Sequence, residues 1–237
     1  MSVLLLVRHG QASFGKRNYD ALSERGHEQA RILGAALAAR GMRPNRIVTG
    51  GMRRHAETAE GILAGLEQGP EVVVDDGWDE FNFEHVVRVH KPLYRSRALM
   101  FADFARTPAA ERRAKFQGIF EDATGRWTGG DADDDYEESF PAFSRRVDDA
   151  LRRTAGQADG FVLVVSSGGP IGLVASHLLA GDASLWSALN RVAVNTGVTK
   201  VLIPRKREVP PGRSGLTLST YNDHSHLEHD RALITYR

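Results

Sequence analysis

Short runs of branched apolar residues alternate along the chain with longer segments whose apolar residues recur at helical spacing. The runs that predict strands are Val3–Val7, Arg46–Thr49, Glu71–Val74, Phe161–Val165, Val198–Ile203 and Leu216–Tyr221. Strands that alternate with helices are typical of a largely parallel sheet with helices on both faces. The pattern therefore predicts an α/β fold, a three-layer α/β/α sandwich with a largely parallel sheet.

Four segments between these runs have the features of helices that pack on a sheet. Ser23 can cap a helix whose apolar residues Ala30, Leu33 and Leu37 share one face. Further helices are predicted over Met52–Leu66, Ser139–Thr154 and Ile171–Leu179, the last opened by Gly168-Gly169-Pro170.

The segment from about His85 to Glu138 interrupts the alternation. It contains helical patterns around Leu99–Ala105 and Glu111–Phe120 and ends in the acidic run Asp131–Glu138. We expect that run to be a solvated loop that caps the next helix, with an acidic metal site as the alternative. We predict a single domain over residues 1–237, with a helical insertion at about residues 85–138.

Composition narrows the classes of function. The net charge of +1 gives no electrostatic reason to expect nucleic acid or a membrane as a partner. The sequence has no cysteine, which excludes thiolate metal sites and cysteine nucleophiles and is compatible with a cytoplasmic protein. The first apolar run is too short for a signal peptide or a membrane span. The expected partner is a small molecule, and the oligomeric state stays open.

Arg8-His9-Gly10 follows directly after the first predicted strand. Ligands of open α/β sheets bind in the crevice at the carboxyl ends of the strands. An arginine offers a permanent forked cation for phosphate or carboxylate, and a histidine offers a nucleophilic nitrogen or a proton carrier. The motif is short, but its position after a buried strand indicates a site.

Two later segments have the features of anion sites. Arg54 follows the second strand and Gly50-Gly51 at the start of a predicted helix, where glycines allow close approach and the helix terminus favours an anion. A solvated pair formed by Arg53 and Arg54 is the alternative. The segment Val164–Pro170 joins a strand to a helix through Ser167-Gly168-Gly169, whose backbone N–H groups can cradle an anion. A plain tight turn is the alternative there.

A carboxyl group follows the third strand, within Trp78–Phe83. Aromatic neighbours can raise the pKa of Glu80 by desolvation, as a general acid near neutral pH requires. Asp79 competes for this role, and spacing alone does not decide between the two. The histidines His224, His226 and His229 could ligate a metal, but we expect a polar C-terminal loop because no carboxylate pattern accompanies them.

Taken together, these segments resemble the histidine phosphatase superfamily, the phosphoglycerate-mutase-like proteins. The segments that carry the resemblance are Arg8-His9-Gly10, Leu22–Ala30, Arg54 with Thr58-Ala59, Glu80, Val164–Pro170, and Asn222-Asp223 with His226-Leu227. The resemblance implies that His9 is phosphorylated, that Arg8 and Arg54 hold the phosphoryl group, and that Glu80 donates the proton.

The sequence departs from the family pattern at two positions. The second catalytic histidine of the family falls at Ser167, in a branch with Ser-Gly-Gly there. The asparagine that many members place six residues after the first histidine falls at Gly15. Ser167 and the amides of Gly168 and Gly169 would then replace the imidazole as neutral donors.

The resemblance implies a metal-independent phosphatase of the histidine acid type, without a cofactor, that hydrolyses a small phosphomonoester through a phosphohistidine, with a phosphorylated protein as the alternative substrate. One alternative is phosphoryl transfer of the phosphoglycerate-mutase type. The other is a phosphate-binding module with weakened catalysis. The sequence does not name the substrate.

Overall fold

A computed structural model describes residues 1–13, 20–67, 69–204 and 215–236 of the chain, so Gly15 lies outside the described residues. The chain divides into two compact units, one formed by Met1–Glu80 with Arg146–Arg237 and the other by Phe81–Arg145. Our expectation of one domain with an insertion at about residues 85–138 stays a prediction.

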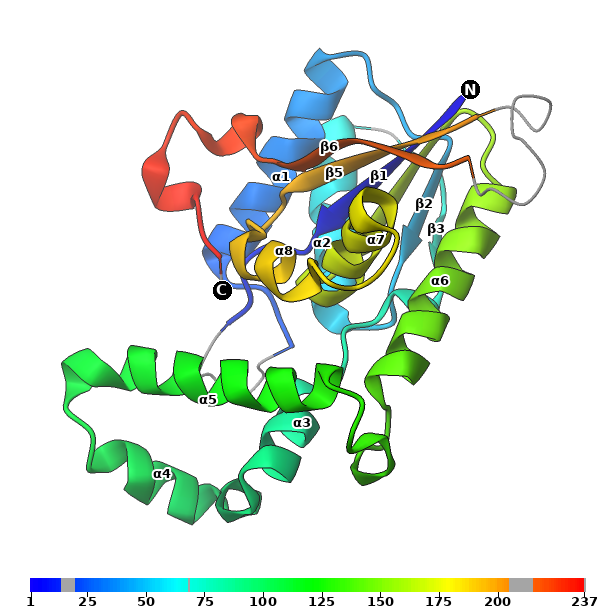
Figure 1. Cartoon of the computed structure of the whole chain (residues 1–237). Helices are drawn as coiled ribbons and strands as arrows, with labels where there is room; N and C mark the ends of the chain where they lie inside the picture. The colour runs from blue at the N-terminus through cyan, green and yellow to red at the C-terminus, as the bar shows by residue number, and fades with distance from the viewer. Residues whose placement is uncertain (14–19, 68, 205–214, 237) are drawn as a thin grey trace. The chain divides into compact units, whose positions relative to one another are not determined.

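The first unit contains a mixed sheet of six strands in the order β3-β2-β4-β1-β5-β6 (Figure 1). The strands are β1 (Ser2–Arg8), β2 (Arg46–Thr49), β3 (Val72–Val74), β4 (Phe161–Ser166), β5 (Val198–Ile203) and β6 (Thr217–Asp223). Neighbours among β1 to β4 pair in parallel, whereas β5 pairs antiparallel with both β1 and β6. The α/β fold class is therefore confirmed, with one strand of opposite direction.

Helices cover both faces of this sheet. Those that belong wholly or mainly to the first unit are α1 (Glu24–Ala39), α2 (Arg53–Leu66), α6 (Phe140–Gly156), α7 (Gly168–Ala180) and α8 (Trp186–Val192). Figure 1 shows α6 and α7 in front of the sheet and α1 and α2 behind it. Behind the sheet, Leu33 and Ile62 pack with Leu5, Ile47 and Leu163 in one buried apolar cluster. These alternate strand residues lie on one face, as the period of a strand requires.

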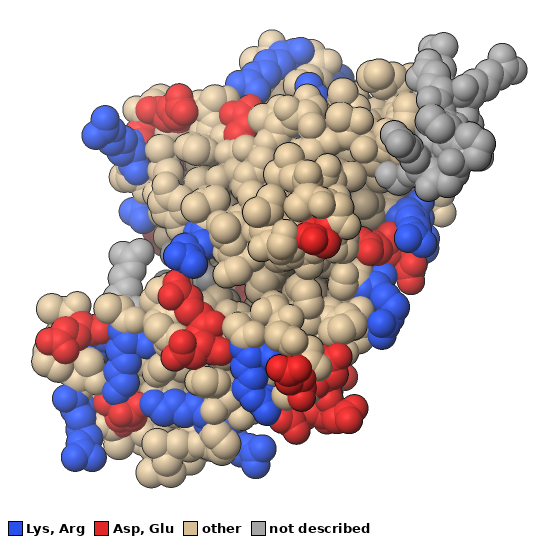
Figure 2. All heavy atoms as spheres, in the orientation of Figure 1, with Lys and Arg blue, Asp and Glu red and all other residues tan. Residues whose placement is uncertain are grey.

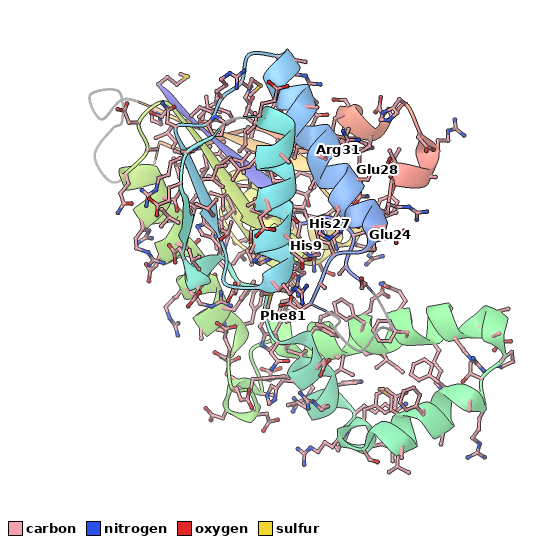
Figure 3. The ribbon with its side chains drawn as sticks, turned by 180° about the vertical axis from the view of Figure 1, so that it is seen from behind. His9, Glu24, His27, Glu28, Arg31 and Phe81 are labelled. Atoms are coloured by element: carbon pink, nitrogen blue, oxygen red, sulfur yellow. The ribbon has the colours of Figure 1, made fainter. Side chains whose placement is uncertain are left out.

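The exposed face of α1 carries its charged residues. Glu24, His27, Glu28 and Arg31 are labelled on it in Figure 3, and all four side chains are exposed. Spacing of three and four residues places such side chains on one face, opposite the buried Ala30, Leu33 and Leu37. Ser23 caps the helix by accepting a hydrogen bond from the Gly26 N–H at 3.1 Å, as the sequence predicts.

The second unit is helical, with α3 (Phe83–His90), α4 (Arg97–Ala105) and α5 (Arg112–Thr128). Its core is aromatic, because Trp127 stacks on Phe81 at 4.6 Å between ring centroids and meets Phe143 at 5.4 Å. Asp103 joins α4 to α5 by accepting a hydrogen bond from Lys115 at 2.7 Å, and it also accepts one from the Tyr94 hydroxyl at 2.5 Å. Helix α3 was not among the predicted elements.

Short 3-10 helices complete the described structure at Asp76–Trp78, Pro92–Arg95, Ala109–Glu111, Asp133–Asp135, Ser225–Leu227 and Arg231–Leu233. Within the described part of the chain, we find no helix with the length and apolar character needed to cross a membrane. On the face drawn in Figure 2, basic and acidic side chains are mixed, and acidic side chains gather in one cluster at the lower right of the view.

Candidate active site

The carboxyl ends of three neighbouring strands form the site. The N–H of His9, directly after β1, donates to the Ser166 carbonyl of β4 at 2.9 Å, and the N–H of Gly50, directly after β2, donates to the Val165 carbonyl at 3.1 Å. The segments that follow the three strands therefore leave the sheet side by side. Figure 3 places His9 at the end of the sheet where α1 and α2 begin.

A close backbone contact fixes the turn after β1. A Cβ atom added to Gly10 would lie 2.4 Å from the carbonyl oxygen of Gly26, and one added to Gly26 would lie 2.3 Å from that of Gln11. Only glycine fits at both positions, because real Cβ atoms do not approach backbone oxygens so closely. The Gly10 N–H also donates to the Thr58 hydroxyl of α2 at 3.0 Å. These contacts explain why the turn after β1 requires Gly10 and why the first turn of α1 requires Gly26.

The His9 side chain is buried, with 7% of its surface exposed. Its Nδ1 lies 2.7 Å from the carbonyl oxygen of Gly10. A carbonyl oxygen can only accept, so Nδ1 carries the proton, and in the neutral ring Nε2 keeps its lone pair. Burial, together with the charges of Arg54 and Arg8, holds the pKa of His9 well below its usual value of 6.5. The ring is thus neutral near pH 7 and has a free nucleophilic nitrogen.

Arg54 lies in the first turn of α2 and is buried, with 7% of its surface exposed. Its Nη1 donates to the Asp20 carboxylate at 2.8 Å, and its Nη2 lies 3.5 Å from the Ser167 hydroxyl. Its Nε is buried without a hydrogen-bond partner in the described structure. A buried guanidinium with an unused donor suits an anionic ligand. The alternative of a solvated arginine pair is not what the structure shows for Arg54.

Arg8 ends β1 and reaches the C-terminal segment. Its Nη1 donates to the carbonyl oxygen of Tyr236 at 2.5 Å and to that of Ala193. A Cβ atom added to Gly168 would lie 3.6 Å from Arg8 Nε and 2.5 Å from the Asn190 side-chain oxygen. The absence of a side chain at Gly168 therefore leaves room between Arg8 and Asn190 at the start of α7.

The structure separates the two competing carboxyl groups after β3. Glu80 is half-buried and accepts a hydrogen bond from the Gly169 N–H at 3.1 Å, which brings its carboxyl group to the turn between β4 and α7. Asp79 instead accepts from the Gly51 N–H at 2.6 Å. Glu80 therefore lies beside the Ser167-Gly168-Gly169 turn, whereas Asp79 lies beside the turn after β2.

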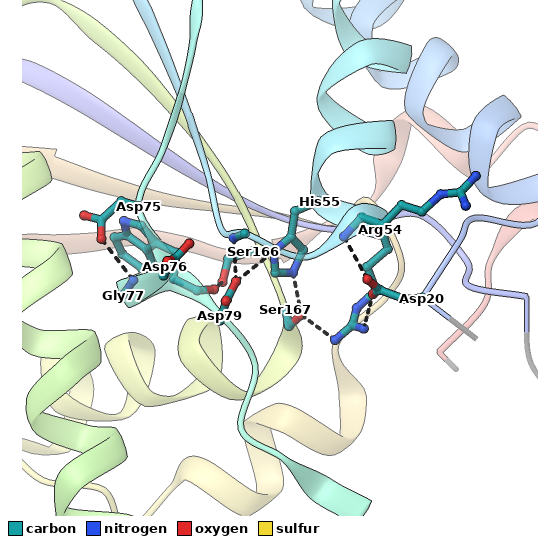
Figure 4. Close-up of polar contacts among 12 residues, drawn as sticks. Asp20, Arg54, His55, Asp75, Asp76, Gly77, Asp79, Ser166 and Ser167 are labelled. Carbon is teal, nitrogen blue, oxygen red and sulfur yellow. Dashed lines mark hydrogen bonds and ion pairs between the residues drawn. The ribbon is translucent and has the colours of Figure 1, made fainter. Parts of the chain in front are cut away.

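His55 is a residue of this site that the sequence analysis missed. It is completely buried in the first turn of α2, and its Nε2 lies 2.8 Å from the Ser167 hydroxyl (Figure 4). Its ring centroid lies 5.8 Å from that of His9. Burial lowers the pKa of His55 below 6.5, and the nearby Asp79 carboxylate partly offsets this. In the sequence His55 follows Arg53 and Arg54, so its burial is not apparent.

Residues toward the C-terminus of the chain hold the backbone next to His9 in place. The Thr196 N–H donates to the Arg8 carbonyl at 3.0 Å, and the Thr196 hydroxyl lies 3.0 Å from His226 Nε2. The Asn222 side chain accepts from the Val194 N–H at 2.8 Å. Our expectation of a polar C-terminal loop is wrong for His226, which is buried in a 3-10 helix.

The predicted site residues thus come from distant parts of the sequence and meet at one end of the sheet. Arg54 Nη2 and His55 Nε2 both lie at the Ser167 hydroxyl, and the His55 ring lies beside that of His9. The Gly169 N–H links Glu80 to the same turn, where Arg8 lies next to Gly168. One buried and one half-buried guanidinium group, a neutral histidine and a carboxyl group at a helix start can bind an anion and transfer a group with a proton. Among the described residues, no group of three or more histidine, aspartate or glutamate side chains is arranged to hold a metal.

Comparison with known proteins extends this description. A 2,3-bisphosphoglycerate-dependent phosphoglycerate mutase from Parvibaculum lavamentivorans is 31% identical over 97 residues, which are 38% of this chain and 46% of that protein. The match thus spans about half the length of the curated relative.

Two solved structures share the fold over nearly the whole chain. A phosphoglycerate mutase from Bacillus anthracis has a TM-score of 0.62 at 19% identity and matches 96% of this chain and 95% of its own. A mutant phosphoserine phosphatase from Entamoeba histolytica, in complex with phosphoserine, has a TM-score of 0.58 at 19% identity and matches 96% of this chain and 100% of its own.

The model of the histidine phosphatase superfamily (branch 1) matches residues 4–118 and 99–210, which together form most of the sequence. These segments contain Arg8, His9, Arg54, Glu80 and Ser167. The chain therefore belongs to the histidine phosphatase superfamily.

Proposed function

We propose that this protein is a phosphatase that hydrolyses a small phosphomonoester through a phosphohistidine on His9. The observation that carries the proposal is the hydrogen bond between His9 Nδ1 and the Gly10 carbonyl at 2.7 Å. It leaves the Nε2 lone pair of a neutral, buried ring available beside two guanidinium groups. A neutral imidazole is the form that can attack phosphorus.

The first step transfers the phosphoryl group to the enzyme. The Nε2 lone pair of His9 forms a bond to phosphorus in line with the ester oxygen, and the bond from phosphorus to that oxygen breaks. Arg8 and Arg54 neutralise the equatorial oxygens, which is most of what phosphoryl transfer requires of a protein. Ser167 and the N–H of Gly168 act as neutral donors to the same oxygens.

Glu80 handles the proton in both steps. As a carboxylic acid it gives its proton to the leaving alkoxide, and as a carboxylate it then takes a proton from water. The oxygen of that water bonds to phosphorus while the N–P bond breaks and returns its electron pair to His9. Glu80 accepts a hydrogen bond from the Gly169 N–H, in the turn that we propose binds the phosphoryl group, and this contact supports Glu80 over Asp79 for the role. The atoms and charges of both steps balance without a metal or a cofactor.

The relatives support a phosphorylated substrate. One solved structure in the fold family is a phosphoserine phosphatase with bound phosphoserine, and the curated relative is a phosphoglycerate mutase. We favour hydrolysis over mutase chemistry because Ser167 stands where the resemblance places a second histidine of the family, and a serine holds no charge of its own directly against the phosphoryl group. A stable phosphoenzyme that waits for a second acceptor benefits from such charge.

The test is a screen of the purified protein against p-nitrophenyl phosphate and a panel of metabolite phosphates. Hydrolysis that is abolished in His9→Ala and retained in His27→Gln, an exposed histidine of α1, is expected. A phosphoglycerate that is isomerised rather than hydrolysed, with dependence on bisphosphoglycerate, would identify a mutase. Phosphate binding without turnover on any substrate would identify a binding module.

A further inference from the structure

A second imidazole lies at the phosphoryl site and has no role in the steps above. His55 is completely buried, and its Nε2 lies 2.8 Å from the Ser167 hydroxyl. Ser167 is itself fully buried, and it stands where the resemblance to the family places a histidine. The chain therefore has an imidazole near that position, but the imidazole belongs to α2, and the Ser167 hydroxyl lies between it and the crevice.

The surroundings of the ring indicate its tautomer. His55 Nδ1 has no hydrogen bond within the described residues, and it lies 3.7 Å from Asp79 Oδ1 (Figure 4). A lone pair on Nδ1 would face a carboxylate oxygen, which is repulsive, whereas an N–H there is attracted to it. The neutral ring therefore carries its proton on Nδ1, and Nε2 accepts a hydrogen bond.

Gly50 provides the space for this pair. A Cβ atom added to Gly50 would lie 2.4 Å from His55 Nδ1 and 2.5 Å from Asp79 Oδ1. The Asp79 carboxylate is held in place by the Gly51 N–H at 2.6 Å. The turn after β2 is thus shaped around a histidine and a carboxylate that face each other.

This tautomer determines the direction of the Ser167 hydroxyl. Nε2 has a lone pair, so the only proton of Ser167 Oγ points to His55, and Oγ accepts from Arg54 Nη2 at 3.5 Å. In this state Ser167 has no proton to offer to a phosphoryl oxygen. A proton added to His55 Nε2 would reverse the hydrogen bond and release the hydroxyl proton toward the crevice.

We propose that His55 is a positioning residue that takes up a proton when a phosphoryl dianion binds, turns the Ser167 O–H toward the ligand, and so strengthens that hydrogen bond by a positive charge one side chain away from the ligand. The inference rests on the proposed function, because it concerns the same phosphoryl site. The proton comes from solvent on binding and returns to solvent when inorganic phosphate leaves. No bond other than N–H and O–H changes.

The charges around His55 are compatible with this switch. Burial and Arg54 lower its pKa, whereas Asp79 and Asp20 raise it, so the ring is neutral in the empty site. A dianion in the crevice adds negative charge beside Arg54 and favours the imidazolium. His9 faces the same ligand and competes for the proton, so the test must separate the two rings.

The experiment measures binding of tungstate, a dianion that resembles phosphate, by titration calorimetry in two buffers with different ionisation enthalpies. The native chain is expected to take up about one proton per tungstate bound at slightly alkaline pH. His55→Gln keeps a hydrogen-bonding amide near Ser167 but cannot take a proton. It is expected to lose the uptake and to bind tungstate about tenfold more weakly, because charge-assisted hydrogen bonds are about twice as strong as neutral ones.

Two further variants separate a relay from a purely structural role. Ser167→Ala removes the link, and His55→Gln added to Ser167→Ala is expected to cause no further loss of affinity, since the two residues act as one unit. Gly50→Ala leaves the ring chemically intact but displaces it from Asp79, and it is expected to lose the uptake as well. His177→Gln is the matched control, because His177 also faces a carboxylate, Asp148 at 3.0 Å, far along α7.

Each outcome decides something. Undiminished proton uptake in His55→Gln would overturn the inference and assign the proton to His9, and losses that multiply in the double variant would also overturn it. An acid-stable phosphate trapped on Ser167 would overturn it too, since the serine would then be a nucleophile. In the first two cases turnover that depends on His9 would leave the proposed function standing, whereas a phosphate trapped on Ser167 would contradict the proposed function as well. No tungstate binding and no turnover in the native chain would overturn both.

Discussion

The buried His226 makes a quantitative prediction about acid stability. Burial lowers the pKa of His226 from its usual 6.5 to about 4, although Asp223 opposes this. In the unfolded chain the ring regains its usual pKa, so between these two pH values the unfolded state binds more protons than the folded state. The free energy of unfolding must therefore fall as the pH decreases through this window.

The size of the effect follows from the two pKa values. Each unit of difference corresponds to about 1.4 kcal/mol, so the loss attributable to His226 amounts to about 3 kcal/mol between pH 6.5 and pH 4. This is a large share of the ~5–15 kcal/mol that stabilises a typical domain. Protonation of His226 also affects the candidate active site, because His226 contacts Thr196, whose N–H donates to the Arg8 carbonyl.

The assay is urea unfolding at a series of pH values from 7.5 to 4.5, with far-UV circular dichroism as the signal. His226→Gln should be less stable than the native chain at pH 7.5 but should lose clearly less stability on acidification. His229→Gln removes an exposed histidine of the same segment and should follow the native chain. The reasoning is refuted if native chain and His226→Gln lose equal free energy over this range.

Two other substitutions test the site and its frame. Glu80→Gln should slow hydrolysis of alkyl phosphates by ~10²–10⁴, and hydrolysis of p-nitrophenyl phosphate far less, because p-nitrophenolate leaves without a proton. Steady-state kinetics on both substrates check this. The control variant Asp79→Asn should slow hydrolysis of both substrates alike. Equal losses on both substrates in Glu80→Gln would point away from Glu80 as the proton donor. Gly10→Ala should destabilise the chain by about 3 kcal/mol, because its methyl group would overlap the Gly26 carbonyl. Gly125→Ala in α5, where the methyl group meets nothing within 4 Å, is its control in thermal melts, and similar melting temperatures for both would contradict the close contact.

Much of the fold could be predicted because its signals are local. Each strand is a short apolar run, and Ser23 marks the start of α1 by a cap that depends only on neighbours in sequence. The antiparallel direction of β5 is not a local property, because it depends on which strand edge the chain reaches after α8. The short helices α3 and α8 were not predicted, because their apolar pattern is too short to indicate a helix.

The site could be predicted in part for a related reason. His9, Arg54 and Ser167 each follow a strand, and the rule that strand ends meet at one edge brings them together. His55 follows a strand as well, but a histidine beside two arginines looks solvent-exposed in a sequence. The buried ring lies against Gly50 and near Asp79, a residue of another segment, so no local pattern indicates its position. His226 was misread as part of a polar loop for the same reason, since its contact with Thr196 joins distant segments.

The most direct test of the central claim is to trap the phosphoenzyme. The purified chain is mixed with a radiolabelled phosphomonoester that it hydrolyses, denatured under alkaline conditions within the first turnover, and mapped by mass spectrometry. The account predicts an acid-labile, base-stable phosphate on His9, absent from His9→Ala, that decays to inorganic phosphate in the native chain. Label on any other residue, or unchanged turnover in His9→Ala, would contradict it.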